Sequence, residues 1–215
     1  MGVKVRVPLR FRAARALLRL LLGLVFRVHV EGGEQLPGGP YLLAANHLSW
    51  VDPFLLLAWL PAGPRLHFLG RRSAVYNRRW KRWLLMFVGG VIPVESGQLR
   101  HLSEAVGGVL QRGGAVAIFP EGGVGPIEGV LQPLRGGVAH FAGDNGVPIV
   151  AAGLAGTHEL WRGKPITIRI GATVLPSGTV VDDMAAIEAA MRAALPPYRD
   201  PGGVRPWPWL TTLLR

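Results

Sequence analysis

A histidine and an aspartate five residues apart are the first candidates for chemistry in this sequence. His47 and Asp52 lie between an apolar run, 41–45, and a segment with helical character that starts at Pro53. A carboxylate bonded to one ring nitrogen of an imidazole fixes the tautomer and makes the other nitrogen a better base. Such a base can deprotonate a hydroxyl group and accelerate a reaction by about 10²- to 10⁴-fold. A purely structural alternative exists, because Asp52 followed by Pro53 is also a good helix N-cap.

A carboxylate and two glycines follow a second apolar run, 115–119, in the order Pro120, Glu121, Gly122 and Gly123. Glycine lets backbone N–H groups approach a ligand closely. Glu121 could orient a substrate hydroxyl or hold a neighbouring donor. The same residues could also form a plain turn with an exposed glutamate.

Three arginines occupy comparable places. Arg71 and Arg72 follow the apolar run 66–69, and Arg135 precedes a segment, 136–144, that reads as a helix. Guanidinium groups suit phosphate recognition, so together these arginines could hold a phosphate. A solvated basic rim explains any one of them equally well.

Short apolar runs alternate with helical segments through residues 31–200, which is typical of an α/β fold. We expect strands at 41–45, 66–69, 91–94, 115–119, 148–154 and 166–174, and helices at 53–60, 78–88, 99–111, 136–144 and 182–195. Isoleucines alternate with polar residues in 166–174, which indicates an edge or antiparallel strand. The prediction is a mixed, mostly parallel sheet flanked by helices, with the chemistry in the loops that follow the strands.

Residues 1–30 contain a basic, apolar helix over roughly 6–28. Its longest uncharged run, 20–26, is far shorter than the roughly 20 apolar residues that a membrane-spanning helix needs. Such a helix can lie in a bilayer interface with its arginines among lipid phosphates, or pack on the domain with a solvated basic face. We therefore divide the chain into a membrane-associating segment (1–30), an α/β domain (31–200) and a Trp- and Pro-rich tail (201–215).

The composition excludes several function classes. The 215 residues contain no cysteine, which excludes a disulfide scaffold, a thiolate metal site and a cysteine nucleophile. The six histidines are scattered, so we expect no metal site. The formal net charge of +11 suits nucleic acid, an anionic membrane surface or an acidic protein. No nucleic-acid motif accompanies the arginines, so we expect no nucleic-acid binding.

The order and spacing of these features resemble the motif blocks of the glycerolipid acyltransferases, the PlsC-like 1-acyl-glycerol-3-phosphate acyltransferases. The matching blocks are Asn46-His47-x4-Asp52, 68–72, Phe119-Pro120-Glu121-Gly122 and 147–150, and the resemblance covers about residues 40–157. It implies transfer of a fatty acyl group from acyl-CoA or acyl-carrier protein to the hydroxyl of a lysophospholipid such as 1-acyl-glycerol-3-phosphate. His47 would be the general base and Asp52 its orienting partner, with no cofactor besides the acyl donor as co-substrate.

The resemblance also implies where the acceptor binds and where the enzyme works. The residues expected to bind substrate are Asn46, Arg71, Arg72, Glu121, Gly122, Gly123 and Arg135. The protein would be a peripheral or monotopic enzyme on the cytoplasmic face of the membrane. Its partners would be an anionic lipid surface, a lipid acceptor and acyl-CoA or an acidic acyl-carrier protein.

Two departures from the family pattern concern the acceptor. The family usually has an arginine after the Gly-x-Ile-x-Val run, and here the run 90–94 is followed by Glu95. The family commonly continues Thr-Arg-Ser after Phe-Pro-Glu-Gly, and here the residues are 123–125, Gly-Val-Gly. A different lipid alcohol, such as a glycolipid, is therefore an alternative acceptor. A catalytically inactive lipid-binding relative is a further alternative, and the intact His47 and Asp52 count against it.

Overall fold

The computed structural model describes residues 8–71, 90–94 and 99–200, together with Gly202, Pro206 and Trp209. Its elements in chain order are α1 (Leu9–Val25), β1 (Arg27–Glu31), the 3₁₀ turn η1 (Gly33–Gln35), β2 (Leu42–Ala45), α2 (Asp52–Trp59), β3 (Leu66–Arg71), β4 (Val91–Val94), α5 (Leu99–Gln111), β5 (Ala115–Ile118), α6 (Gly137–Asn145), β6 (Ile149–Ala155), β7 (Pro165–Val174) and α7 (Val180–Ala194). The expected helix 78–88 and most of the tail lie outside the described residues.

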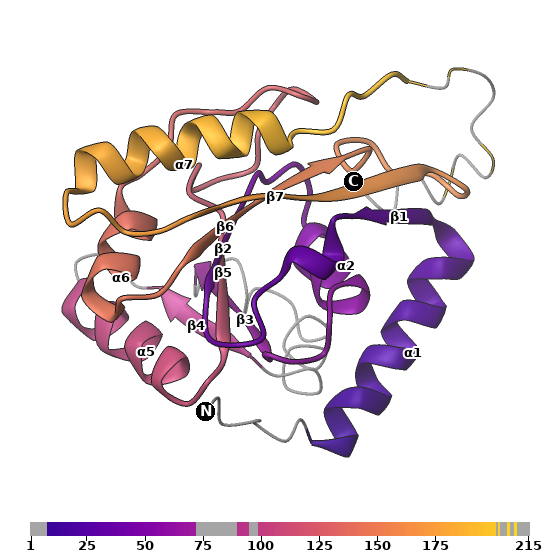
Figure 1. The fold of residues 1–215 in the computed structure, drawn as a ribbon. Coiled ribbons are helices and arrows are strands. Elements are labelled where there is room, and N and C mark those ends of the chain that lie inside the picture. Colours follow the sequence, from indigo (N-terminus) through magenta and orange to yellow (C-terminus); the bar gives the residue numbers. More distant parts are fainter. Residues whose placement is uncertain are drawn as a thin grey trace.

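Within the described residues, seven strands form one sheet in the order β1-β7-β6-β2-β5-β3-β4 (Figure 1). β7 runs antiparallel to β6, and every other neighbouring pair is parallel. The mixed, mostly parallel sheet predicted from the sequence is therefore confirmed. β7 has the predicted antiparallel partner, but it is not an edge strand, because β1 pairs with its other side.

Helices cover both faces of the sheet, and alternate residues of each strand serve the two cores. In β2, Leu43 and Ala45 pack on the side of α1 and α2, whereas Leu42 and Ala44 pack on the side of α5, α6 and α7. All four are fully buried. Strands buried on both faces read as continuous apolar runs, which is why β2, β5 and β6 are easy to predict from the sequence.

The N-terminal segment is part of the folded domain. Phe11, Ala14 and Leu18 of α1 are buried, and two of them belong to the core on the α2 side of the sheet. The boundary expected after residue 30 falls within β1, which joins the sheet beside β7. Apolar side chains of α1 and the pairing of β1 with β7 therefore bind this segment to the α/β domain. Among the described residues, no helix is both long and apolar enough to cross a bilayer.

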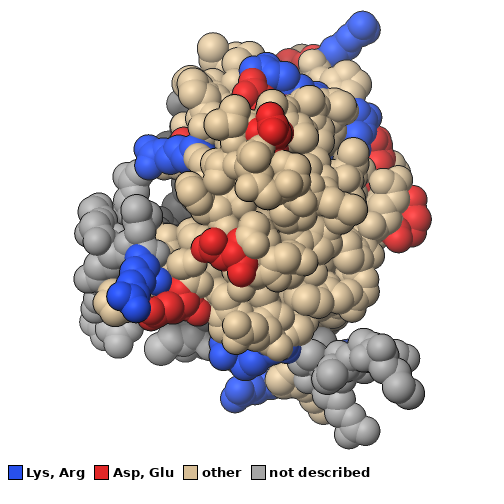
Figure 2. All heavy atoms as spheres, turned by 60° about the vertical axis from the view of Figure 1, so that its left-hand side comes forward, with Lys and Arg blue, Asp and Glu red and all other residues tan. Residues whose placement is uncertain are grey.

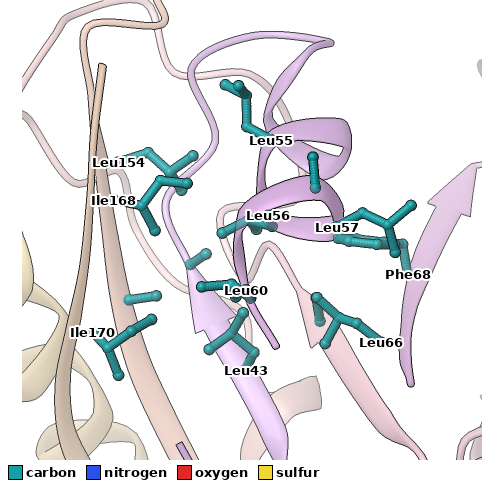
Figure 3. Packing of buried hydrophobic residues seen from close by; sticks show 14 of the residues in the cluster. Leu43, Leu55, Leu56, Leu57, Leu60, Leu66, Phe68, Leu154, Ile168 and Ile170 are labelled. Atoms are coloured by element: carbon teal, nitrogen blue, oxygen red, sulfur yellow. The ribbon is translucent and has the colours of Figure 1, made fainter. Parts of the chain in front are cut away.

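Helix α2 is the element that positions the candidate carboxylate. It begins with Asp52 at the carboxyl end of β2 and lies over one face of the sheet. Figure 3 shows Leu55, Leu56 and Leu57 of α2 among side chains from β2, β3, β6 and β7. Leu55 and Leu56 have no exposed surface, so the helix has little freedom to slide on the sheet.

Candidate active site

His47 and Glu121, two of the residues predicted to do chemistry, follow neighbouring strands that end on the same side of the sheet. β2 and β5 are parallel neighbours, and Ala44 lies opposite Ile118 in the ladder. The loops after these two strands, which contain His47 and Glu121, therefore leave the sheet side by side at its carboxyl edge. Sequence analysis predicts this position for the chemistry, because loops at this edge carry the ligand-binding residues of open α/β sheets.

His47 and Asp52 form a direct contact. Nδ1 of His47 lies 2.9 Å from Oδ2 of Asp52. The same oxygen accepts the backbone N–H groups of Leu48 at 2.7 Å and Ser49 at 2.8 Å. Asp52 is completely buried, whereas 18% of the His47 side chain is exposed. The imidazole is thus oriented from the interior and remains accessible from outside.

Asp52 does not cap helix α2. The N-cap residue is Val51, and Asp52 occupies the first helical position. Its carboxylate accepts hydrogen bonds from Leu48 and Ser49, which precede the helix, rather than from the first turn. The alternative interpretation of Asp52 as a simple N-cap is therefore wrong. Its place in the first turn still favours a negative charge through the helix dipole.

The backbone of His47 is held by Glu121. Oε1 of Glu121 accepts the N–H of His47 at 2.8 Å, and Oε2 accepts the N–H of Gln132 at 2.9 Å. The carbonyl oxygen of His47 accepts the N–H of Gly125 at 2.6 Å. Both peptide groups of the histidine are therefore fixed by the segment that follows β5.

The ring of His47 stacks on Phe119, with centroids 4.2 Å apart and planes at 17°. No role for Phe119 follows from the sequence alone, although its place directly before Pro120 and Glu121 is a signal. Gly125, whose N–H holds the histidine, was missed too. An added Cβ at Gly125 would lie 3.3 Å from the His47 carbonyl oxygen, so the backbones approach closely there.

Asn46 is buried and holds the neighbouring strand. Its Nδ2 donates to the carbonyl of Leu154 at 3.0 Å, and its Oδ1 accepts the N–H of Leu154 at 2.7 Å. The side chain thereby extends the β2–β6 ladder beyond the last paired residues. The structure places Asn46, expected to bind substrate, in the support beneath His47.

Arg135 lies against the Glu121-Gly122 turn. The backbone N–H of Arg135 donates to the carbonyl of Pro120 at 2.8 Å. Gly122 has φ +73°, which favours glycine, and a Cβ there would lie 2.5 Å from Nε of Arg135, so the arginine side chain would have to move. Arg135 is exposed. Around Gly123 an added Cβ would meet no atom within 4 Å, which leaves open space beside the turn.

Of the other two predicted arginines, the structure describes the backbone position of Arg71 and does not describe Arg72. Arg71 ends β3, at the same edge of the sheet as His47, but β5 separates β3 from β2. Arg72 lies outside the described residues. Within the described ranges, no group of three or more His, Asp or Glu side chains is arranged to hold a metal ion.

Comparison with known proteins identifies the family. The model of the Acyltransferase family matches residues 27–155, which is more than half of the chain and contains the whole His47 site. The chain belongs to this family.

Two curated relatives have sequences similar to this chain. It is 39% identical over 119 residues to lyso-ornithine lipid O-acyltransferase of Pseudomonas aeruginosa, covering 54% of this chain and 43% of that protein. It is 26% identical over 144 residues to 1-acyl-sn-glycerol-3-phosphate acyltransferase of Cocos nucifera, covering 66% of this chain and 46% of that protein. The chain thus spans less than half the length of these relatives.

A solved structure has the same fold. The crystal structure of the 1-acyl-sn-glycerophosphate (LPA) acyltransferase PlsC from Thermotoga maritima superposes with a TM-score of 0.68 at 20% identity. The match covers 86% of this chain and 78% of that chain. The three-layer architecture described above is therefore that of PlsC.

Proposed function

We propose that this protein is an O-acyltransferase that moves a fatty acyl group from acyl-CoA or acyl-carrier protein to the hydroxyl of a lysolipid. The observation that carries the proposal is the contact between His47 and the buried Asp52. Membership of the acyltransferase family and the names of the relatives support the reaction class.

The tautomer of His47 supports its role as the base. An ionised carboxylate only accepts hydrogen bonds, so Nδ1 of His47 carries the proton in its contact with Asp52. Nε2 then presents a lone pair, and it has no hydrogen-bond partner among the described residues. A hydroxyl that reaches the exposed part of the ring can give its proton to Nε2.

The reaction then needs no covalent enzyme intermediate. As Nε2 of His47 takes the hydroxyl proton, the hydroxyl oxygen attacks the thioester carbonyl, and an ester C–O bond forms. The C–S bond breaks, and the departing thiolate takes the proton from the imidazolium. Asp52 stabilises the positive charge that His47 carries between these two transfers.

Two lysolipids are candidate acceptors. 1-Acyl-glycerol-3-phosphate is the acceptor class in the name of the Cocos nucifera relative, and Arg135 beside Gly122 offers one cation for its phosphate. A less anionic lysolipid is favoured by Glu95 and by Gly-Val-Gly at 123–125, where the family has arginine and Thr-Arg-Ser. The relative from Pseudomonas aeruginosa is named for lyso-ornithine lipid.

We further propose that the enzyme acts at the cytoplasmic face of a membrane as a peripheral or monotopic protein. On α1, leucines remain exposed beside arginines, namely Leu9, Leu17, Leu20, Leu21 and Leu24 beside Arg10, Arg12 and Arg19. An apolar face flanked by arginines suits an anionic lipid surface. The surface around α5 and α6 differs from α1 in its charge: Figure 2 shows a broad area there with few charged side chains.

The test is an acyl-transfer assay with purified protein, labelled acyl-CoA or acyl-carrier protein, and three dispersed acceptors: 1-acyl-glycerol-3-phosphate, lyso-ornithine lipid and a lysoglycolipid. We expect an acylated product with at least one donor–acceptor pair. His47→Ala should lower turnover by about 10²- to 10⁴-fold. His140→Ala, which changes an exposed histidine on α6, should not. No product with any pair would favour the inactive lipid-binding alternative, and full turnover by His47→Ala would exclude His47 as the base.

A further inference from the structure

The loop after Glu121 has an apolar surface that the proposed reaction does not use. We propose that residues 122–131, with Val124, Ile127 and Val130 exposed, insert into the lipid bilayer at the mouth of the active site. We call this segment the apolar loop. The inference rests on the proposed function, because it names the surface from which the lipid acceptor enters.

The apolar loop adjoins the catalytic histidine. The N–H of Gly125 donates to the carbonyl of His47 at 2.6 Å. At its base, the two oxygens of Glu121 accept the N–H groups of His47 and Gln132. The loop is therefore fixed at the site, and whatever surface it touches lies close to the His47 ring.

The exposed side chains of the loop are aliphatic. Val124, Ile127 and Val130 are exposed to 57%, 56% and 45% respectively. From 122 to 134 the only charged residue is Glu128. Glu128 is half-buried, and its two oxygens accept the N–H of Gly156 at 2.7 Å and that of His158 at 3.2 Å. The exposed side chains of the loop are thus aliphatic, and its one carboxylate is engaged by backbone N–H groups, which suits hydrocarbon rather than headgroups.

The apolar loop and the last turn of α1 lie at the same end of the sheet. Glu128 holds the loop to Gly156 and His158, which follow β6. Further along the same connection, Gly163 donates its N–H to the carbonyl of Val25 at the end of α1. Since β1 starts opposite the first residue of β7, this end of α1 lies at the same edge of the sheet as the active site.

A bilayer fits this combination better than other occupants do. An acidic acyl-carrier protein would need a cluster of cations, but the apolar loop itself contains none, and the exposed Arg135 lies at its base, against Gly122. The last turns of α1 expose Leu20, Leu21 and Leu24, so one lipid surface could contact both elements. A lipid acceptor would then reach His47 without crossing water.

The test uses the absence of cysteine from the chain. Single variants Ile127→Cys, Leu20→Cys and Leu175→Cys, each labelled with the environment-sensitive fluorophore NBD, are mixed with vesicles of phosphatidylethanolamine and phosphatidylglycerol. Leu175 is the matched control: it is 71% exposed and follows Val174, which pairs with the first residue of β6. It therefore lies at the opposite edge of the sheet.

We expect a blue-shifted emission, quenched by lipids brominated in their acyl chains, at positions 127 and 20 but not at 175. If the label at position 127 stayed in water while the label at position 20 entered the bilayer, the inference would be overturned, and the proposed acyl transfer would be unaffected. Equal insertion at position 175 would also overturn it, because it would indicate unspecific adsorption. A label at 127 that is shielded without vesicles, in a dimer seen by sedimentation, would assign the loop to a second copy instead.

Activity supplies an independent readout. The double variant Ile127→Asn with Val130→Ser should lose about tenfold activity on a vesicle-embedded acceptor, because it can no longer bury these aliphatic groups. On a short-chain lysolipid below its critical micelle concentration it should stay within about twofold of the wild type. Equal losses on both acceptors would overturn the inference. Leu175→Asn is the control variant for both assays.

Discussion

Asp52 concentrates its hydrogen bonds on one oxygen. Oδ2 accepts from Leu48 and Ser49 and holds Nδ1 of His47, whereas Oδ1 is buried with no hydrogen-bond partner among the described residues. An asparagine could keep its carbonyl oxygen in the place of Oδ2. The loop geometry would then survive, and only the negative charge that the proposed mechanism needs beside the imidazolium would be lost.

We therefore expect Asp52→Asn to lower turnover by about 10²- to 10⁴-fold. The midpoint of thermal unfolding should change little, because the two backbone N–H groups keep an acceptor. Acyl-transfer kinetics and a thermal melt of the same preparation measure both effects. Near wild-type turnover would show that Asp52 only shapes the loop.

Glu121 has two possible roles, which make different kinetic predictions. The sequence predicts that it binds the acceptor, whereas the structure shows each oxygen engaged by a backbone N–H, from His47 and Gln132. Glutamine supplies only one acceptor oxygen, so Glu121→Gln leaves one of these N–H groups facing an amide NH2. If Glu121 positions His47, kcat falls and KM for the acceptor changes little. A rise in KM at unchanged kcat would show that it binds the acceptor.

Residue types predicted the pair His47 and Asp52, because these side chains suit the proposed chemistry and their spacing allows contact. The supports of the pair were harder to predict. Glu121 accepts the backbone N–H of His47. The side chain of Asn46 bonds to both backbone groups of Leu154, 108 residues away, as a paired strand residue would. Backbone groups are the same at every position, so the sequence does not show which of them a side chain will bind.

At the scale of elements, α1 is joined to the helix that starts with Asp52. Nε of Arg15 donates to the carbonyl of Leu57 at 3.0 Å, and its Nη2 donates to the carbonyl of Leu60. The last carbonyls of a helix have no partner within it, so this arginine satisfies the end of α2. The pKa of Arg15 is lowered by burial and by nearby Arg19. A basic residue of α1 thus faces the protein rather than lipid.

Arg15→Met should lower the free energy of unfolding by about 1–3 kcal/mol, because buried carbonyls lose their donor. Arg12→Met, at an exposed position on the same helix, should stay within about 0.5 kcal/mol of the wild type. Urea unfolding measures both. Equal stability of the two variants would show that α1 is held by its apolar side chains alone.

Element prediction worked where the apolar pattern was unambiguous and failed at β1. Its residues, Arg27–Glu31, alternate polar and apolar side chains directly after the leucines of α1, so they read as the end of a helix. They form a strand because β7 offers an unpaired edge, and Arg169 of β7 binds Glu31 at 2.5 Å. Pairing with a partner so distant in sequence decides this element, and local pattern does not.

At the scale of the molecule, Glu128 links two loops at the active-site edge. Burial raises the pKa of Glu128, while the N–H groups of Gly156 and His158 and the charge of Lys164 act in the opposite direction. The folded chain therefore binds this proton more tightly than the unfolded chain. Stability is lost as pH rises from the ordinary glutamate range through the raised pKa, and it is regained on acidification.

Glu128→Gln removes this titration. Between about pH 7 and about pH 5, the melting temperature of the wild type should rise relative to that of Glu128→Gln. Glu34→Gln, at an exposed position in η1, should show no such pH-dependent difference. Thermal melts across the range measure the effect, and a difference that moves in the opposite direction would contradict it.

The packing of α7 on the sheet depends on a glycine that faces it. A Cβ at Gly153 in β6 would lie 2.2 Å from the carbonyl oxygen of Ala194 at the end of α7, so helix and strand approach to a distance that no side chain permits. Gly153→Ala forces α7 away from a closely packed core, which should cost about 1–3 kcal/mol of unfolding free energy.

Gly143→Ala is the matched control. It lies within α6 with no atom within 4 Å of the added Cβ, and should stabilise the protein by about 0.5–1 kcal/mol. Denaturant unfolding of both variants should therefore give changes of opposite sign, and a neutral Gly153→Ala would mean that α7 does not set the spacing of this layer.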